Sequence, residues 1–263
     1  MTFFALLLAF LALTPTPTPL PEPDLSVLAY NLHMEKNEVE PVLDVLRAAD
    51  ADIVGLVETH YELVAVIDLL FNTLYPYRTT VVFGDTNRTM LMSRYPLLTV
   101  ERWPGDEIEM LRAIIDFDGR EVVVYVVHPT SPGNTGYDSS TRSEQIDLLL
   151  ETAAAETAPT LLLGDFNMEE WSADYDAITA AYVDAFRTLH ALADDPGFTY
   201  PDYSLPQSQR NARLPNFTPL ILRLDYIFHS ADFETLAAQV WPDSGGSDHR
   251  PVYAELRLTS AMP

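Results

Sequence analysis

The chain has 263 residues, enough for one large α/β domain with a full hydrophobic core. Its formal net charge of −24 at pH 7 repels polyanions, which argues against a tight, processive binder of nucleic acid. The charge does not exclude a nuclease, because a bound cation and a few local arginines can hold one phosphate. The chain has no cysteine, which excludes disulfides and thiolate zinc sites.

The first segment, residues 2–13, is apolar and is followed by a Thr/Pro-rich stretch. It is too short to span a bilayer, which needs about 20 residues, but it fits a secretory signal. The Thr-Pro repeat predicts an extended spacer. We therefore expect residues 1–24 to be a signal or a membrane-anchor remnant, and residues 25–263 to be a functional domain that is secreted or membrane-tethered outside the cytoplasm. No basic residue precedes the apolar stretch, and a leader without a targeting role is the alternative.

Apolar runs in the first half of the domain predict short strands with two helices between them. We expect strands at residues 25–30, 52–57, 79–83, 89–93, 97–102 and 111–117, and helices at residues 39–49 and 61–71. Asp118-Gly119 is a hairpin turn signal that leads into a strand at residues 121–127. That strand is apolar on both faces, which predicts a central position with cover on both sides.

The second half continues the alternation of strands and helices. We expect helices at residues 141–157 and 174–192, and strands at residues 160–164, 224–228, 234–240 and 251–258. Short mixed strands, a hairpin and interspersed helices predict two packed β-sheets with helices outside them.

Six polar clusters stand at the edges of these apolar runs. They are Asn31, Glu58, His128, Asp165 with Asn167, Asp225, and Asp248 with His249. Strand ends are favoured positions for sites, because the strands fix side chains while the adjoining loops stay wet. Carboxylates, amides and imidazoles suit a divalent cation and proton transfer on a phosphoester.

Six motifs in this order resemble the endonuclease/exonuclease/phosphatase superfamily. Its members include pancreatic-type deoxyribonuclease, apurinic-site endonucleases, neutral sphingomyelinases and inositol-polyphosphate phosphatases. The resemblance covers roughly residues 25–258, and the motifs are Asn31, Glu58, His128, GDFN at 164–167, DYIF at 225–228 and SDH at 247–249. It implies a four-layer α/β/β/α sandwich and a metal-dependent phosphoesterase.

The resemblance also implies a role for each residue of the metal site. Glu58 would ligate Mg²⁺, or Mn²⁺ in its place. Asn31 would support the metal or touch the phosphate, and Asp248 would be a further metal or histidine partner.

The remaining motif residues would act on the phosphate. The resemblance implies that Asp165 orients or deprotonates the attacking water and that Asn167 stabilises the transition state. His249 would be the phosphate-contacting base or acid, held by Asp225, and His128 would contact the phosphate or protonate the leaving group. Taken one at a time, such residues are often structural, for example as an Asx turn at a strand exit or as a core histidine.

Arginines supply the expected substrate contacts. By resemblance, Arg112 faces the phosphate. Residues 203–224 contain Arg210, Arg213 and Arg223 but no acid, which we interpret as a mobile loop that attracts phosphate. The alternative is that these arginines pair with surface acids. We expect Arg142 to tie loops together, and His33 and His60, although near the rim, to be solvated loop histidines.

The leading interpretation is a divalent-metal-dependent phosphoesterase that works by activated-water attack. Its phosphoester substrate is a lipid headgroup or a nucleic acid, and we expect a monomer whose leader can contact a membrane. The alternatives are a secreted non-specific endonuclease and a catalytically silent binding module on the same fold.

Overall fold

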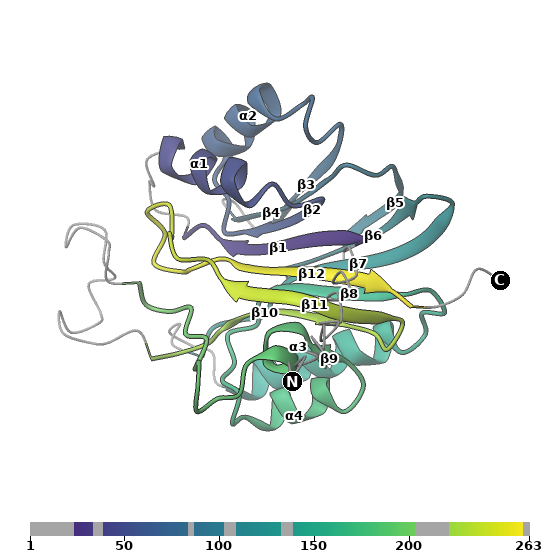
Figure 1. Cartoon of the computed structure of the whole chain (residues 1–263), viewed down its shortest axis with the longest axis vertical. Helices are drawn as coiled ribbons and strands as arrows, with labels where there is room; N and C mark the ends of the chain where they lie inside the picture. Colours follow the sequence, from purple (N-terminus) through teal and green to yellow (C-terminus); the bar gives the residue numbers. More distant parts are fainter. Residues whose placement is uncertain are drawn as a thin grey trace, which may run out of the picture.

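The computed structural model describes residues 24–33, 39–83, 87–102, 109–132, 139–202 and 221–259. Two six-stranded β-sheets lie face to face, with helices on their outer faces (Figure 1). The expected leader, residues 1–24, falls almost entirely outside the described residues. Among the described helices, none is long and apolar enough to cross a membrane.

The first sheet carries two helices on its outer face. Its strand order is β11-β12-β1-β2-β4-β3. The elements are β1 (Leu25–Asn31), α1 (Val39–Ala49), β2 (Ile53–Val57), α2 (Tyr61–Leu70), β3 (Tyr77–Phe83), β4 (Asn87–Ser93), β11 (Phe233–Val240) and β12 (Val252–Leu258).

The second sheet has the order β5-β6-β7-β8-β10-β9. Its elements, with the helices beneath it, are β5 (Leu97–Arg102), β6 (Glu109–Phe117), β7 (Arg120–His128), α3 (Ser139–Ala153), β8 (Thr160–Asp165), α4 (Ala173–Thr179), β9 (Val183–Asp184), α5 (Ala185–Leu189) and β10 (Asp225–His229).

Three buried apolar clusters account for this layering. One fills the space between the sheets, where Val27, Ile53, Val124 and Leu163 belong to it. A second lies between the first sheet and helices α1 and α2, and a third lies between the second sheet and helices α3 and α4. Strands β2, β7 and β8 contribute to the inter-sheet cluster and to an outer one, which explains their continuous apolar runs. The predicted sandwich of two packed mixed sheets with outer helices is confirmed.

The expected helix over residues 174–192 is wrong, because the structure divides it. Helix α4 follows the N-cap Ser172, whose hydroxyl accepts a hydrogen bond from the Tyr175 N–H. Asp184 then serves as the N-cap of α5 by accepting from the Arg187 N–H. An aspartate inside an apolar-periodic stretch competes for backbone donors and starts a new helix there.

Candidate active site

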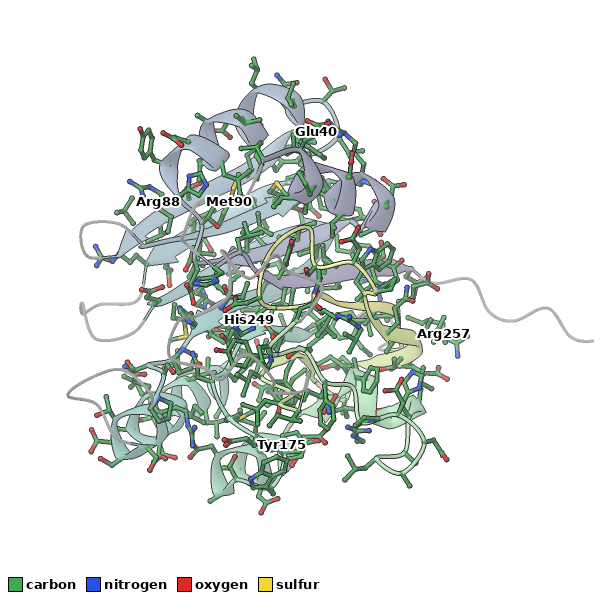
Figure 2. All side chains as sticks on the ribbon, turned by 90° about the vertical axis from the view of Figure 1, so that its left-hand side faces the viewer. Glu40, Arg88, Met90, Tyr175, His249 and Arg257 are labelled. Atoms are coloured by element: carbon green, nitrogen blue, oxygen red, sulfur yellow. The ribbon has the colours of Figure 1, made fainter. Side chains whose placement is uncertain are left out.

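The polar strand ends meet at one edge of the sandwich because of strand direction and side-chain alternation. β1 and β2 run parallel, as do β7 and β8, so each pair ends on the same side. Asn31, His128, Asp165 and Asp225 continue the inward-facing positions that build the inter-sheet core. Figure 2 views the molecule from this side, and His249 lies near the middle of the face.

Asn31 joins carboxylates from the two sheets. Its Nδ2 donates to Glu58 Oε1 at 3.0 Å and to Asp165 Oδ2 at 2.9 Å. Its Oδ1 accepts from the His33 N–H at 2.9 Å, which fixes the orientation of the amide. In this geometry the amide of Asn31 holds the two carboxylates close together by donating a hydrogen bond to each.

His128 lies between carboxylates on both sides of its ring. Nε2 is 3.3 Å from Glu58 Oε1 and 3.8 Å from Asp165 Oδ2, while Nδ1 is 3.1 Å from Glu109 Oε2. Burial alone would lower the pKa of His128, but the Glu109 hydrogen bond and the nearby carboxylates raise it to about 9. Burial would likewise raise the pKa of Glu58, yet His128 and Asn31 bring it below its ordinary value. At neutral pH, therefore, the imidazole is protonated and Glu58 is ionised.

His249 forms a second imidazole–carboxylate pair on the other side of Asp165. Its Nδ1 lies 2.8 Å from Asp225 Oδ2, and its Nε2 lies 3.8 Å from Asp165 Oδ2. Burial opposes protonation of His249, but Asp225 and Asp165 raise its pKa well above the ordinary value. The Tyr200 ring packs against the imidazole with centroids 4.6 Å apart. His249 is thus held in one orientation as a cation at the centre of the edge.

Asp165 is buried between the two imidazoles. Burial raises its pKa to about 6, although His249 opposes that rise. A carboxylate with a pKa near neutrality is a better proton acceptor than an ordinary aspartate at the same pH. Gly164, with φ of 137°, allows β7 to approach closely here: a Cβ at this position would lie 2.0 Å from the Val127 carbonyl oxygen.

Hydrogen bonds hold both the backbone and the side chain of Asn167. Its N–H donates to Asp165 Oδ1 at 2.8 Å, and its Nδ2 donates to the Pro129 carbonyl at 2.9 Å. Arg142 Nη1 donates to the Asn167 carbonyl at 2.6 Å, and Arg142 Nε donates to Asp174 Oδ2 at 2.8 Å. The expectation that Arg142 ties loops together is confirmed.

Three residues of this edge have backbone conformations that L-residues rarely adopt. Glu58, Asn167 and His33 have φ of 53°, 49° and 45°. Such strain is retained only where the surroundings enforce it, and it concentrates at functional sites. The contacts of Asn31 and Arg142 described above supply that enforcement.

His33 is part of the edge, contrary to the expectation that it is a solvated loop residue. Its Nδ1 lies 2.9 Å from Asp248 Oδ1, and its side chain is 20% exposed. Burial opposes protonation of His33, but Asp248 raises its pKa above the ordinary value. Ser247 Oγ donates to the Asn31 carbonyl at 2.7 Å, which anchors this segment to β1. His60, by contrast, caps helix α2 by accepting from the Leu63 N–H at 3.4 Å.

The carboxylates of the edge outnumber its imidazoles. The carboxylates are Glu58, Glu109, Asp165, Asp225 and Asp248, and the imidazoles are His33, His128 and His249. Ligand atoms of Glu58, His128 and Asp165 all lie within 4.8 Å of one another. Hard oxygen donors in surplus, with a nearby imidazole, fit a divalent cation such as Mg²⁺ or Mn²⁺.

Comparison with known proteins agrees with this geometry. Residues 28–249 match the sequence model of the Endonuclease/Exonuclease/phosphatase family. The chain belongs to this family. No functionally curated protein matches the sequence significantly.

Solved structures of the family share the fold. The endonuclease/exonuclease/phosphatase from Beutenbergia cavernae DSM 12333 has a TM-score of 0.71 and 22% identity, covering 90% of this chain and 72% of that one. D. rerio TDP2 complexed with single strand DNA product has a TM-score of 0.71 and 16% identity, covering 89% and 98%. The human Nocturnin catalytic domain has a TM-score of 0.65 and 17% identity, covering 89% and 94%.

Of the three arginines expected to bind phosphate, one lies away from the edge and two lie outside the described residues. Arg112 does not reach the edge: its side chain lies on the helix-facing side of β6, where Nε and Nη2 donate to Glu156 at 2.7 and 2.9 Å. The alternation of β6 explains this, because Leu111 and Ala113 already occupy its inter-sheet face. Arg210 and Arg213 lie outside the described residues, so their role stays a prediction.

Arg223, the third arginine of that stretch, is buried and paired with acids. It contacts Asp184 at 2.6 Å through Nη2 and also contacts Glu170. Arg223 is therefore paired with acids, as in the alternative, but its partner Asp184 is buried and does not lie on the surface. The described residues on either side of 203–220 are joined near the edge by a bridge between Tyr200 and Leu222.

Glu109 is a residue of the site that the sequence interpretation missed. The signal was present, because Asp118 and Gly119 form a two-residue turn that pairs Phe117 with Arg120. Continuing this register outward pairs Glu109 with His128. A residue opposite a candidate catalytic histidine is itself a candidate, and hairpin register alone identifies it.

Proposed function

We propose that this protein is a divalent-cation-dependent phosphoesterase that hydrolyses a phosphodiester or phosphomonoester by attack of an activated water. The observation that carries the proposal is the position of Asp165, whose Oδ2 lies 3.8 Å from Nε2 of both His128 and His249. One buried carboxylate between two protonated imidazoles places a base and two cationic donors within reach of one phosphate.

The cation would be held by Glu58, with Asp248 as a further ligand. When bound, it supplies positive charge that neutralises the phosphate and the developing oxyanion. Asn31 keeps Glu58 and Asp165 in place through its two donated hydrogen bonds. Mg²⁺ needs only one or two carboxylates, which fits this set, and Mn²⁺ accepts similar ligands.

The proton transfers are assigned to the buried groups of the second sheet. Asp165, with its pKa raised to about 6, accepts the proton of the attacking water. His249, held by Asp225, contacts a phosphate oxygen as a cation, and Asn167 presents its amide to the same group. His128 gives its proton to the leaving oxygen as the phosphorus–oxygen bond breaks, which its pKa of about 9 permits at neutral pH.

A lipid headgroup is the substrate class that we favour. The net charge of −24 opposes the approach of a long polyanion, whereas a single headgroup phosphate meets only the local field. The apolar residues 2–13 would place the domain at a membrane outside the cytoplasm. We propose that the protein acts there as a monomer. Nucleic acid is the second candidate, because the related TDP2 structure from D. rerio contains a single strand DNA product.

The test is hydrolysis of bis-p-nitrophenyl phosphate by the purified protein with and without EDTA. We expect chelation to abolish turnover and added Mg²⁺ or Mn²⁺ to restore it. Glu58→Gln should require far more cation for half-maximal rate, while Glu62→Gln, an exposed neighbour on α2, should behave as wild type. Full activity in excess EDTA would overturn the proposal.

A substrate panel then separates the candidates. Sphingomyelin and phosphoinositide vesicles should be hydrolysed faster than plasmid DNA or single-stranded RNA if the headgroup assignment is correct. The reverse order would identify a secreted endonuclease. Cation binding without hydrolysis of any of these substrates would indicate the silent binding module.

A further inference from the structure

Gln145 is a polar residue on the buried face of helix α3, and the proposed function does not use it. The buried residues of α3 are Arg142, Gln145, Ile146, Leu149 and Ala153, and the last three belong to the apolar cluster beneath the second sheet. Gln145 is only 5% exposed. A buried amide is costly unless it is hydrogen-bonded, so the contacts of Gln145 indicate what it does in the fold.

Two hydrogen bonds join Gln145 to Thr130, in the loop that follows β7. Gln145 Oε1 accepts from the Thr130 N–H at 2.7 Å, and Gln145 Nε2 donates to Thr130 Oγ1 at 3.0 Å. The side-chain amide of Gln145 therefore holds Thr130 both by its backbone and by its hydroxyl. The loop is fixed to α3 two residues after His128, where β7 ends.

The peptide unit between Pro129 and Thr130 connects Gln145 to Asn167. The Thr130 N–H and the Pro129 carbonyl are the two polar groups of this unit, and Asn167 Nδ2 donates to that carbonyl at 2.9 Å. A peptide unit is planar, and in the trans form its N–H and C=O point in opposite directions. When Gln145 fixes the direction of the N–H, it therefore fixes the direction of the C=O as well. Pro129 limits the unit further, because the proline ring fixes φ.

The Pro129 carbonyl determines which end of the Asn167 amide faces it. A carbonyl oxygen only accepts, so Asn167 has to turn its NH2 group toward Pro129 and cannot turn Oδ1 there. Arg142, which lies three residues before Gln145 and on the same face of α3, donates to the Asn167 carbonyl at 2.6 Å. Helix α3 thus holds the backbone of Asn167 through Arg142 and its side chain through Gln145.

We propose that Gln145 is the positioning residue for the Asn167 amide and that it acts through the peptide unit between Pro129 and Thr130. This inference rests on the proposed function, in which Asn167 presents its amide to a phosphate oxygen. With Gln145 in place, Asn167 Nδ2 keeps one N–H on the Pro129 carbonyl and directs the other at the phosphate. Without Gln145, the peptide unit can rotate, and the Asn167 amide loses the acceptor that sets its orientation.

The experiment compares Gln145→Met and Gln145→Glu in steady-state hydrolysis of bis-p-nitrophenyl phosphate. Methionine has a similar volume but makes neither hydrogen bond. We expect Gln145→Met to lower kcat by on the order of 10-fold with little change in KM, because a misdirected donor mainly weakens stabilisation of the transition state. A glutamate carboxylate can accept from the Thr130 N–H and from its hydroxyl, so Gln145→Glu should recover most of the lost kcat.

Two control variants separate positioning from stability. Thr130→Val removes only the hydrogen bond of the hydroxyl and leaves the backbone N–H to Gln145, so it should lower the free energy of unfolding while kcat stays near that of wild type. Leu149→Ala removes apolar packing from the same face of α3 and should also destabilise the fold without lowering kcat. All rates are compared at a temperature at which circular dichroism shows each variant to be folded.

NMR of the Asn167 side chain tests the positioning without any turnover. One of the two Nδ2 protons should be hydrogen-bonded and shifted downfield from the other in wild type and in Thr130→Val, and this difference should shrink in Gln145→Met. An unchanged difference in Gln145→Met would overturn the inference.

The kinetics can also overturn the inference, and in a way that is distinct from failure of the proposed function. Gln145→Met combined with Asn167→Ala should be no slower than Asn167→Ala alone, because Gln145 acts only through Asn167. Additive losses in this double variant, or equal losses of kcat in Gln145→Met and Leu149→Ala, would show that Gln145 does not position Asn167. If Asn167→Ala itself keeps normal kcat, the phosphate contact in the proposed function fails instead, and the NMR result still decides the positioning.

Discussion

The active-site edge and the cluster around Arg223 both bury carboxylates, but they neutralise them with different cations. At the edge, the described ion pairs of Asp165 are with imidazoles. In the other cluster, Arg223 contacts Asp184 and Glu170, and Arg187 donates twice to Glu170. The edge takes its groups from both sheets. The other cluster is built from β9, α5, the loop after β8 and the residue two places before β10.

The kind of cation distinguishes a cluster that can transfer protons from one that only stabilises the fold. An arginine keeps its charge at every accessible pH, whereas an imidazole gains and loses its proton near neutrality. Two arginines facing two acids form a balanced unit that joins α5 to β10 and the loop after β8. The edge, with carboxylates in surplus over imidazoles, remains open to a cation and to proton transfer. Burial of charge by itself therefore does not identify an active site, whereas the kind of counter-charge does.

The largest expected effect comes from removing the carboxylate of Asp165, which we propose as the general base. Asp165→Asn should lower kcat by on the order of 10²–10⁴-fold. Stability at pH 7 should not fall, because burial raises the pKa of Asp165 and the ionised form therefore opposes folding. Steady-state kinetics measure kcat, and urea unfolding measures the free energy of unfolding. Burial raises the pKa of Asp184 to about 6 as well. Asp184→Asn should nevertheless lower stability, with near-normal kcat, because it removes the carboxylate that the buried Arg223 contacts. If the two variants changed kcat and the free energy of unfolding in the same way, the two clusters would not differ in role.

Removing an arginine from the second cluster should affect stability alone. Arg187→Ala leaves Glu170 with fewer partners and frees the carbonyls of His190, Asp195 and Pro196. The free energy of unfolding should fall by roughly 3 kcal/mol, as for a broken buried pair. Arg47→Ala, which removes an exposed pair with Glu40 and Asp44, should leave it nearly unchanged. A large loss of kcat in folded Arg187→Ala protein would contradict the supporting role.

The two kinds of counter-charge should also differ in their pH dependence. In cation-free protein, the pKa of His128 is raised from 6.5 to about 9, so its stabilisation is complete below pH 6.5 and is lost as pH rises through about 9. Urea unfolding between those pH values should show a decline of up to ~3 kcal/mol. His128→Gln should make the decline smaller, and the part that remains should come from His249 and His33, whose pKa values are also raised. His229→Gln should not make it smaller, because burial lowers the pKa of His229 below its ordinary value.

The smallest effect should come from the histidine next to the edge that serves only as a helix cap. His60→Ala removes the acceptor of the Leu63 N–H and should cost about 0.5–1 kcal/mol of stability, with kcat unchanged. His60→Asp should restore or exceed wild-type stability, because aspartate is a better N-cap. Thermal unfolding with parallel kinetics checks both variants, and a drop in kcat would place His60 in the site.

The strands and their polar ends could be predicted from the sequence because each run carries its own signal. A buried strand such as β7 reads as a continuous apolar run, and the polar residue that ends it follows directly. The split of residues 174–192 had a local signal, because Asp184 caps α5, but the pairing of Asp184 with Arg223, which lies far along the chain, had none. Local pattern describes elements well and long-range pairing poorly.

Side-chain partners were the least predictable part of the site. Arg112 was assigned to the phosphate by resemblance, but strand alternation turns it toward Glu156. His33 looked like a loop residue, and only the return of the chain at Asp248 gives it a partner. The position of Glu109 opposite His128 could have been predicted, because the register of a hairpin follows from its turn and from the number of residues between the turn and each position.

The proposed catalytic groups share their inward register with the core, which would couple correct folding to activity. His128 follows Val124 and Val126 at alternate positions, and Asp165 follows Leu161 and Leu163. Both faces of β7 and β8 are apolar and buried, so insertion of one residue would exchange the two faces without exposing apolar side chains, but it would turn the proposed catalytic group away from the edge. If variants of this chain were selected for turnover, the selection would therefore also remove variants with a shifted strand register. Few of the active variants should be misfolded.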